Sequence, residues 1–163
     1  MSSEDLSEQV IATWRRHNDV HRLLIDAIPD EGLAAKPSGS RGRDVARVFA
    51  HLYRVRLGWL HHHETGKRPK LPRYDQGPPP PKSQLLEWIS ESGDAVEAWL
   101  AKALQGEVAP RYFGKNPVRW LGYLISHESH HRGQVALALK QSDIKLPESV
   151  AVNGLWGRWI FGS

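Results

Sequence analysis

Hydrophobic residues recur every three or four positions in four segments of the chain, which is the spacing of one face of an α-helix. This pattern predicts helices over residues 4–28, 44–64, 83–104 and 116–141. No segment shows the strict alternation of apolar and polar residues that is typical of a β-strand buried on one side. The pattern therefore predicts an all-α fold.

Turn and cap residues mark the ends of these predicted helices. Pro29 ends the first helix, because proline lacks the backbone N–H that a helix needs. Asp44 is a suitable N-cap for the second helix, and Gly66 lies just past its end. Asn116 and Pro117 start the fourth helix as an N-cap and a first-turn proline.

Residues 65–82 hold six prolines and two glycines, so we expect an extended crossover rather than a helix. A long crossover between the second and third helices predicts a four-helix bundle with up-down-down-up topology. The C-terminal tail should fold back on the bundle. Its Trp156 and Trp159 are expected to pack in the core or in a dimer interface, with a pocket wall as the alternative. We expect residues 1–163 to form a single domain.

Composition excludes several classes of site. The chain has no cysteine, so disulfides, thiolate metal sites and cysteine nucleophiles are excluded, and any metal must be held by His, Asp or Glu. The first residues are polar and resemble no secretory signal, and no apolar run approaches the ~20 residues of a membrane span. We therefore expect a cytoplasmic protein that does not contact a membrane.

The net charge of +4 arises from 22 basic and 18 acidic residues that are interleaved along the chain. No run of five Lys or Arg residues occurs, which argues against nucleic acid as a partner. Attraction for a small anionic substrate explains the surplus equally well. The nine histidines are more informative, because a purely structural core has little use for so many.

Two of these histidines, His127 and His131, are four apart on the last predicted helix, so they share one face. Leu124 and Val135 continue that face on either side, which indicates that it is turned toward the core. Buried imidazoles need partners, because an unsatisfied polar group costs about 1–3 kcal/mol. A shared metal ion at ~2.0–2.1 Å would meet that need.

On the second helix we expect Val48, His51 or Leu52, Val55 and Trp59 to form the inward stripe. The spacing alone leaves the third ligand open between His51 on that helix and the pair His17 and His21 on the first. The run at residues 61–63 ends the second helix about three turns, or ~15 Å, beyond His51, so we expect it to be solvated. His130 should face a neighbouring helix or water.

The letters from His127 to His131 also spell H-E-x-x-H, the motif of zinc proteases. The longer form of that motif would need glycine at position 134 and histidine at position 137, where the chain has Gln134 and Leu137. Glu128 to His131 spells the E-x-x-H of di-iron bundles, but that site needs a second copy and none exists. Both assignments are rejected.

Four features together resemble the DinB-like (YfiT-like) superfamily of metal-dependent bundles: "HESHHRGQ" on the last helix, a histidine in "VFAHL" on the second, the Pro-rich crossover and "GLW" near the end. The resemblance covers nearly the whole chain, although the final "LWGRWIFGS" is unusually apolar. It implies an up-down-down-up bundle whose metal ligands are His51, His127 and His131. His17 and His21 would then line the pocket.

The resemblance also implies a reaction class. Relatives include S-transferases that use a low-molecular-weight thiol and a mycothiol-dependent isomerase, so we expect a thiol-dependent S-transferase acting on a small molecule. A metal-dependent hydrolase and a non-catalytic metal-binding or dimerising bundle are the alternatives. Three histidine ligands suit zinc or nickel, and also iron, and leave positions open for substrate. The relatives further imply a homodimer.

Four residues around the histidine pair are further candidates for a role. We expect Glu128 to accept hydrogen bonds or form an inter-helix ion pair, with a general base as the alternative. Gln134 could hydrogen-bond a bound water or the groups that surround the metal ligands. Arg132 could anchor an anion or form a surface salt bridge. Gly133 costs the helix ~1 kcal/mol relative to alanine, which predicts close approach of a neighbouring helix or a ligand.

Overall fold

The structure is a computed structural model that describes residues 3–161. Within them it contains five α-helices and no β-strand, which confirms the all-α prediction. Each long helix begins and ends within one residue of its predicted bounds. These helices are α1 (Ser3–Ala27), α2 (Val45–Thr65), α3 (Lys82–Leu104) and α4 (Pro117–Gln141).

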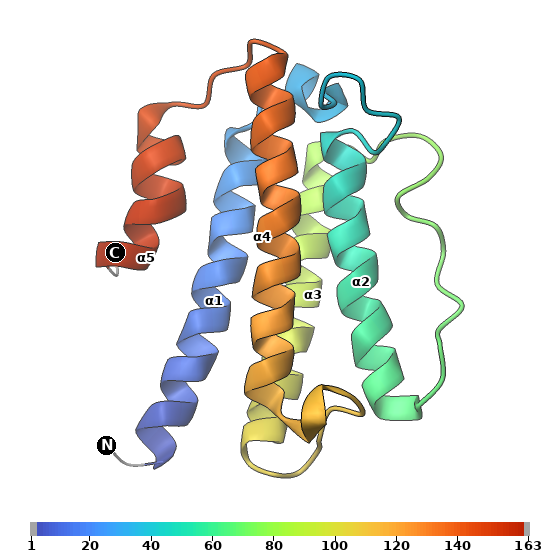
Figure 1. The fold of residues 1–163 in the computed structure, drawn as a ribbon, viewed down its shortest axis with the longest axis vertical. Coiled ribbons are helices and arrows are strands. Elements are labelled where there is room, and N and C mark those ends of the chain that lie inside the picture. Colours follow the sequence, from blue (N-terminus) through green and yellow to red (C-terminus); the bar gives the residue numbers. More distant parts are fainter. Residues whose placement is uncertain (1–2, 162–163) are drawn as a thin grey trace.

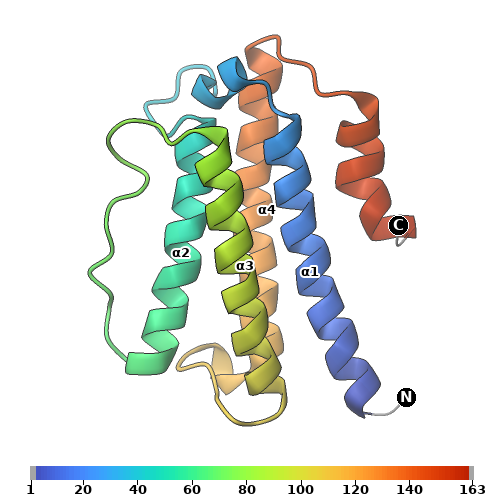
Figure 2. The same cartoon turned by 180° about the vertical axis from the view of Figure 1, so that it is seen from behind.

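The four long helices lie side by side along the long axis of the molecule. In Figure 1, α1 runs upward, α2 runs downward, and the crossover of residues 66–81 returns the chain to the top. The third helix then runs downward and α4 runs upward. Seen from behind, α3 lies between α1 and α2, against which it packs, and α4 lies on the far side (Figure 2).

Local hydrogen bonds explain where α2 and α4 begin. The side chain of Asp44 accepts a hydrogen bond from the backbone N–H of Arg47, and the side chain of Asn116 accepts two from the first turn of α4. Gly66 ends α2 with a φ of 74°, a left-handed conformation that glycine adopts without steric cost. Two short 3₁₀-helices that the pattern did not predict, η1 (Asp30–Ala34) and η2 (Phe113–Lys115), occupy the connections before α2 and α4.

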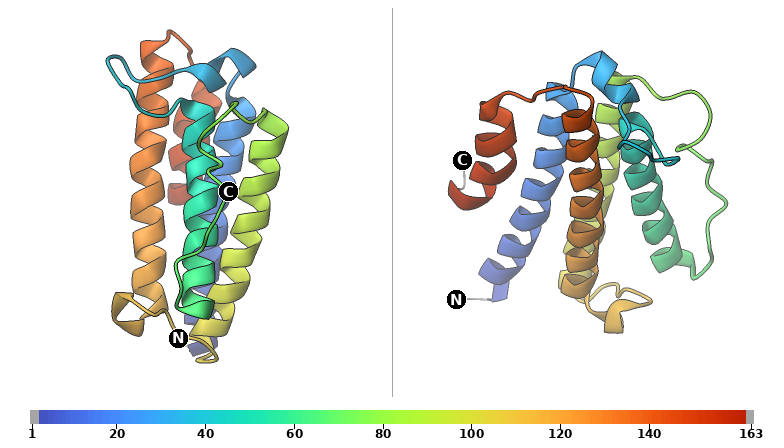
Figure 3. Two further views of the ribbon diagram at one scale, coloured as in Figure 1. Left: turned by 90° about the vertical axis from the view of Figure 1, so that its right-hand side faces the viewer. Right: turned by 45° about the horizontal axis from the view of Figure 1, so that its top comes forward.

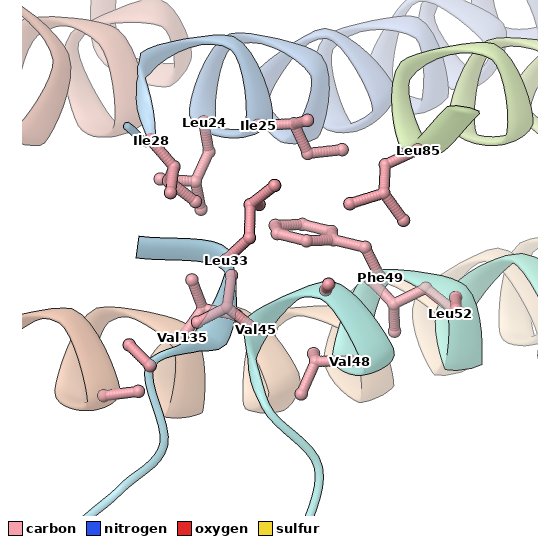
Figure 4. Close-up of a cluster of buried hydrophobic side chains, with 14 of the residues drawn as sticks. Leu24, Ile25, Ile28, Leu33, Val45, Val48, Phe49, Leu52, Leu85 and Val135 are labelled. Carbon is pink, nitrogen blue, oxygen red and sulfur yellow. The ribbon is translucent and has the colours of Figure 1, made fainter. Parts of the chain in front are cut away.

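Two hydrophobic clusters form the core, one toward each end of the bundle. Figure 4 shows the cluster that joins η1 to the adjoining turns of α1, α2, α3 and α4. Its larger members are Leu24, Ile25, Ile28, Leu33, Val48, Phe49, Leu52, Leu85, Ile89 and Val135. The second cluster is richer in tryptophan and contains Trp14, Leu60, Val96, Trp99, Leu100, Trp120 and Leu124. The polar sites described below lie along the helices between these clusters.

The C-terminal tail consists of η3 (Ser149–Gly157, a π-helix) and α5 (Arg158–Phe161), and it lies beside α1 (Figures 1 and 3). Core packing is wrong for Trp156, which is 63% exposed, and Trp159 is 36% exposed. The reason is that Gly154 makes the close contact with the bundle: a Cβ there would lie 2.4 Å from Leu23 Cδ2. Trp156 is therefore turned outward, whereas the ring of Trp159 lies beside that of the buried His17, with centroids 6.3 Å apart.

None of the helices in residues 3–161 combines the length and the apolar character that crossing a bilayer requires.

Candidate metal centre

The structure brings His51 of α2 together with His127 and His131 of α4. Each offers a ring nitrogen, and these three atoms lie within 4.8 Å of one another. The ring centroids are 4.7 Å apart for the α4 pair, and the centroid of His51 lies 5.6 Å from that of His127 and 4.9 Å from that of His131. We call these three residues the open cluster, because each is only partly buried.

The open cluster lies at the edge of the core because α2 is rotated from the orientation expected from its sequence. The buried side of α2 carries Leu52, Arg56 and Leu60, whereas Val55 and Trp59, which were expected to point inward, are partly exposed. His51 shares this half-buried side and is 16% exposed. The cluster therefore lies nearer to solvent than the fully buried residues of the core.

The same correction applies to α4. At the level of the cluster, the fully buried position is Glu128, whereas His127 is partly buried and His131 is 9% exposed. Two adjacent residues, His127 and Glu128, thus point to different sides of α4, about 100° apart. The helix separates two polar clusters.

Burial keeps the imidazoles of the open cluster neutral. Burial, together with the charge of Arg43, lowers the pKa of His51 to about 4. The pKa of His127 and that of His131 are also lowered, mainly by burial. Below its pKa a histidine carries a proton on both nitrogens and cannot bind a cation. At pH 7 all three rings can therefore offer a lone pair.

Gln134 fixes the orientation of His131. The Nδ1 atom of His131 lies 2.8 Å from Gln134 Oε1, an oxygen that only accepts, so this nitrogen donates its proton. The lone pair of His131 is then on Nε2. The amide group of Gln134 lies 3.1 Å from His130 Nε2, to which it donates, and His130 is exposed as expected. This arrangement gives Gln134 the supporting position anticipated for it.

Asp75, in the crossover, is a supporting residue that the sequence analysis missed. Its carboxylate is 3% exposed, and Oδ2 lies 3.8 Å from His51 Nδ1. The same oxygen accepts hydrogen bonds of 2.8 and 2.7 Å from Arg43. Although burial alone would raise the pKa of Asp75, the Arg43 guanidinium outweighs it and the pKa is lowered. Asp75 is the only acidic residue in the sequence of the crossover, but nothing in that sequence indicated that the segment would bring it beside His51.

These observations fit a divalent cation. Among residues 3–161, the buried Nδ1 atom of His127 has no hydrogen-bond partner, and the Nδ1 atom of His51 lies 3.8 Å from Asp75 Oδ2, which leaves Nε2 of His51 for a cation. Three nitrogens bound tetrahedrally at ~2.0–2.1 Å would lie roughly 3.4 Å apart, so small rotations of the rings would close the site. A carboxylate behind a ligand histidine is also typical of metal sites, where it orients the ring. His51, His127 and His131 could therefore hold one metal ion.

A second group of possible ligands lies inside the bundle and comprises His17, His21 and Glu128, each fully buried. The Nε2 atom of His17 donates to Glu128 Oε2 at 2.9 Å, and that of His21 lies 3.8 Å from the same oxygen. The Nδ1 atom of His21 donates to the carbonyl oxygen of His17. His17 and His21 thus belong to the core, and the expectation that they line a pocket is wrong because neither is exposed.

Arg56 completes this group, which we call the closed cluster. Its Nε and Nη2 atoms each donate to one oxygen of Glu128 at 2.7 Å. Its Nη1 atom donates to Asn18, to the carbonyl oxygen of Ile89 and to Ser92. Burial alone would raise the pKa of Glu128, but Arg56 and His17 outweigh it, and the pKa lies well below its usual value.

The distances in the closed cluster would also allow a metal ion, but its charges are already balanced. Both oxygens of Glu128 accept strong hydrogen bonds, and the guanidinium of Arg56 lies where a cation would add like charge. The expected ion-pair role of Glu128 thus agrees with its contacts. The open cluster contains no positively charged side chain of this kind, so it is the better cation site.

The histidine run that ends α2 is not solvated throughout. His61 is exposed as expected, but His63 is only 5% exposed. Its ring lies 4.9 Å from that of Trp99 and 4.8 Å from that of Trp120, and burial lowers its pKa to about 4. The expectation failed because His63 continues the buried side of α2 one turn beyond Leu60.

Arg132 and Gly133 lie on the side of α4 that faces the tail. Arg132 Nη2 donates to Ser129 Oγ at 3.2 Å, and both Arg132 and Gly133 line a hollow whose wall includes Trp156. This position agrees with the pocket-wall alternative for Trp156. The close approach of a neighbouring helix expected at Gly133 is wrong, because a Cβ there would meet nothing within 4 Å among the described residues. The alternative, close approach of a ligand, stays a prediction.

Comparison with known proteins agrees with this geometry. A model of the DinB family matches residues 1–145, which include α1 to α4 and every residue of both clusters. No curated protein matches the chain. Because the matched region spans most of the sequence, the chain belongs to the DinB family.

Proposed function

We propose that His51, His127 and His131 bind one divalent cation and that the protein is a metal-dependent S-transferase, which joins a small thiol through its sulfur to an electrophilic substrate as the thiol loses its proton. The observation that carries this proposal is the convergence of three neutral imidazoles from two helices within 4.8 Å. Zinc or nickel, and also iron, suit an all-nitrogen ligand set. Three protein ligands leave positions open, as in catalytic rather than structural sites.

The surrounding residues support this role by orienting the ligands. Gln134 holds His131 in the tautomer that exposes Nε2, and Asp75 lies behind His51. A bound divalent ion would polarise a substrate oxygen or hold a thiolate. The thiol must come from a cosubstrate, because the chain has no cysteine. Such chemistry requires a reduced thiol, so we place the enzyme in the cytoplasm.

A metal-dependent hydrolase is the alternative, because a metal-bound water can have a pKa near ~7. In zinc proteases the glutamate of H-E-x-x-H is the general base. Here the corresponding Glu128 lies in the closed cluster, where Arg56 and His17 occupy its oxygens. The alternative would therefore need another base, and this favours thiol transfer.

We further propose that the protein is a homodimer. The outer side of the tail exposes Val152, Ile160 and Phe161, which are 52%, 69% and 77% exposed. Neighbouring apolar side chains of this size on a surface are typical of contact sites. Sedimentation at two concentrations should give the mass of two chains. The substitution Phe161→Glu should shift the monomer–dimer equilibrium toward the monomer.

Metal analysis of untagged protein tests the proposal. Wild-type protein should bind about one equivalent of zinc or nickel, and His131→Ala should bind almost none. His130→Ala is the matched control, because His130 is exposed and lies next to the cluster without joining it. Equal metal content in the two variants would overturn the ligand assignment. A screen of thiols against electrophiles then tests the reaction, and turnover of ester substrates alone would favour the hydrolase.

A further inference from the structure

A pocket adjoins the open cluster along the seam between α2 and α4. The side of α2 that carries His51 continues at Val55, Gly58 and His62, at helical spacings of four, three and four residues. The last three of these residues line a pocket of about 440 Å³. Pockets of roughly 300–1,000 Å³ are typical of small-molecule sites. The crossover and the loop before α4 supply its other walls.

Tyr123 connects this pocket to the candidate metal ligands. It lines the pocket and lies one turn before His127 on α4. Its ring is stacked on that of His127, with centroids 5.7 Å apart and an interplanar angle of 21°. A molecule in the pocket would therefore contact the wall of the open cluster directly.

The lining has a definite chemical character. Trp59, Tyr112 and Tyr123 contribute aromatic rings, and Arg54 and Arg68 contribute positive charge. None of the described residues that line the pocket is acidic. Arg54 donates one hydrogen bond, from Nε to the carbonyl oxygen of Pro72 at 3.3 Å, and Arg68 is exposed. Guanidinium groups bind carboxylates and phosphates well, and aromatic rings favour a planar apolar group.

Gly58 is the reason that the pocket is open on the side of α2. An added Cβ would have Leu71 Cδ1 as its nearest neighbour, at 4.0 Å, so no packed side chain fills this space. Glycine inside a helix costs ~1 kcal/mol relative to alanine. Here the absent side chain leaves room for a ligand.

We propose that this pocket is the substrate subsite and that it takes a small organic anion with a planar apolar part. The anionic group pairs with Arg54 or Arg68, and the planar part packs on Trp59 and Tyr123. This inference rests on the proposed function, because the pocket is a substrate subsite only if the protein is the proposed enzyme. Binding in the pocket does not require the metal.

Calorimetry on metal-free protein tests the subsite with 2-naphthoate as the probe and 2-naphthamide as its uncharged match. Naphthoate should bind, and naphthamide should bind about tenfold to a hundredfold more weakly, as expected for hydrogen bonds to a charged group. The double variant Arg54→Ala with Arg68→Ala should weaken naphthoate binding, and the control Arg41→Ala, at an exposed arginine before α2, should not. Equal binding of the two probes, or equal naphthoate binding by the double variant and the control, would overturn the proposal.

Substitution at Gly58 provides an independent test. Gly58→Leu should fill the pocket and abolish naphthoate binding, whereas Gly58→Ala should retain it. Metal affinity should be unchanged in both variants, because Gly58 lies two turns from His51. Naphthoate binding that survives Gly58→Leu would overturn the subsite. A wild-type protein that binds naphthoate but no metal would refute the proposed function and leave the subsite standing.

Discussion

The open and closed clusters use similar side chains on two sides of one helix, yet they meet opposite requirements. In the closed cluster the charge of Glu128 is compensated by Arg56, and both residues are fully buried. In the open cluster three neutral imidazoles face one another at the edge of the core, and none of them carries a charge. Each cluster leaves two buried imidazole nitrogens without a hydrogen-bond partner among the described residues, so the charge balance is what separates the two clusters. A compensated ion pair stabilises the fold and disfavours a further cation, whereas neutral imidazoles are available for one.

The adjacent residues His127 and Glu128 show how the helix produces this division. A rotation of about 100° per residue places one at the seam with α2 and the other in the core. The motif H-E-x-x-H therefore does not place its glutamate near a bound metal here. Removal of side chains from each cluster should reveal the difference as a loss of stability on one side and a loss of metal on the other.

The largest effect is expected from Glu128→Ala. It leaves the charge of Arg56 buried without a partner, which should reduce the free energy of unfolding by about 3–5 kcal/mol. Urea unfolding measures the change. The control is Glu97→Ala, whose partner Arg15 is 51% exposed, and it should cost less than about 1 kcal/mol. The double variant Arg56→Met with Glu128→Leu should regain much of the loss. If Glu128→Ala lowers the free energy of unfolding no more than Glu97→Ala does, the closed cluster is not a stabilising buried ion pair.

Asp75→Ala should instead weaken metal binding about tenfold to a hundredfold, because the carboxylate behind His51 is lost. Stability should change little, since Arg43, which is 38% exposed, can then be hydrated. Competition with a coloured chelator measures the affinity. Asp94→Ala, at an exposed position of α3, is the control. If the two variants bind metal equally well, Asp75 has no part in the site.

His63 is a buried histidine outside both clusters, so its substitution shows how burial of a histidine affects stability without any change in metal binding. Burial lowers its pKa to about 4, below the value of ~6.5 in the unfolded chain. Between these values the unfolded chain binds more protons, so stability is complete above about pH 6.5 and falls as the pH drops toward 4. His63→Phe should flatten this dependence in unfolding experiments on metal-free protein. An unchanged slope would show that His63 is not the group responsible.

The smallest effects are expected at two glycines. Gly133→Ala should raise the melting temperature slightly, because a Cβ would meet nothing nearby and the helix gains up to ~1 kcal/mol. Gly93→Ala should lower it, because a Cβ would lie 2.2 Å from Asn18 Nδ2, beside the closed cluster. A fall in melting temperature for Gly133→Ala would show that α4 is packed more closely there than the structure indicates.

Periodicity and cap residues were sufficient to predict the helices, because each of these signals is local. The rotation of α2 was not predicted, because Val55 and Trp59 are as apolar as core residues but line the seam. A usable signal was present in Arg56, which lies between Leu52 and Leu60 on the buried side, and in Glu128 beside Leu124. One base and one acid in two apolar stripes indicate a buried ion pair.

The three histidines of the open cluster were predicted only in part for a similar reason. Spacing along one helix indicated that His127 and His131 could share a metal, but the choice of His51 over His17 and His21 depended on the family resemblance. Asp75 could not be foreseen. Its role depends on how an irregular crossover returns along the bundle, and hydrophobic periodicity carries no information about such a segment.

The most direct test is anomalous diffraction from a crystal of untagged protein grown with zinc, recorded on both sides of the zinc absorption edge. We expect one strong peak ~2.0–2.1 Å from a ring nitrogen of each of His51, His127 and His131. No peak is expected among His17, His21 and Glu128. A peak in the closed cluster, or a zinc-free open cluster at saturating zinc, would contradict the division between a metal site and a structural ion pair.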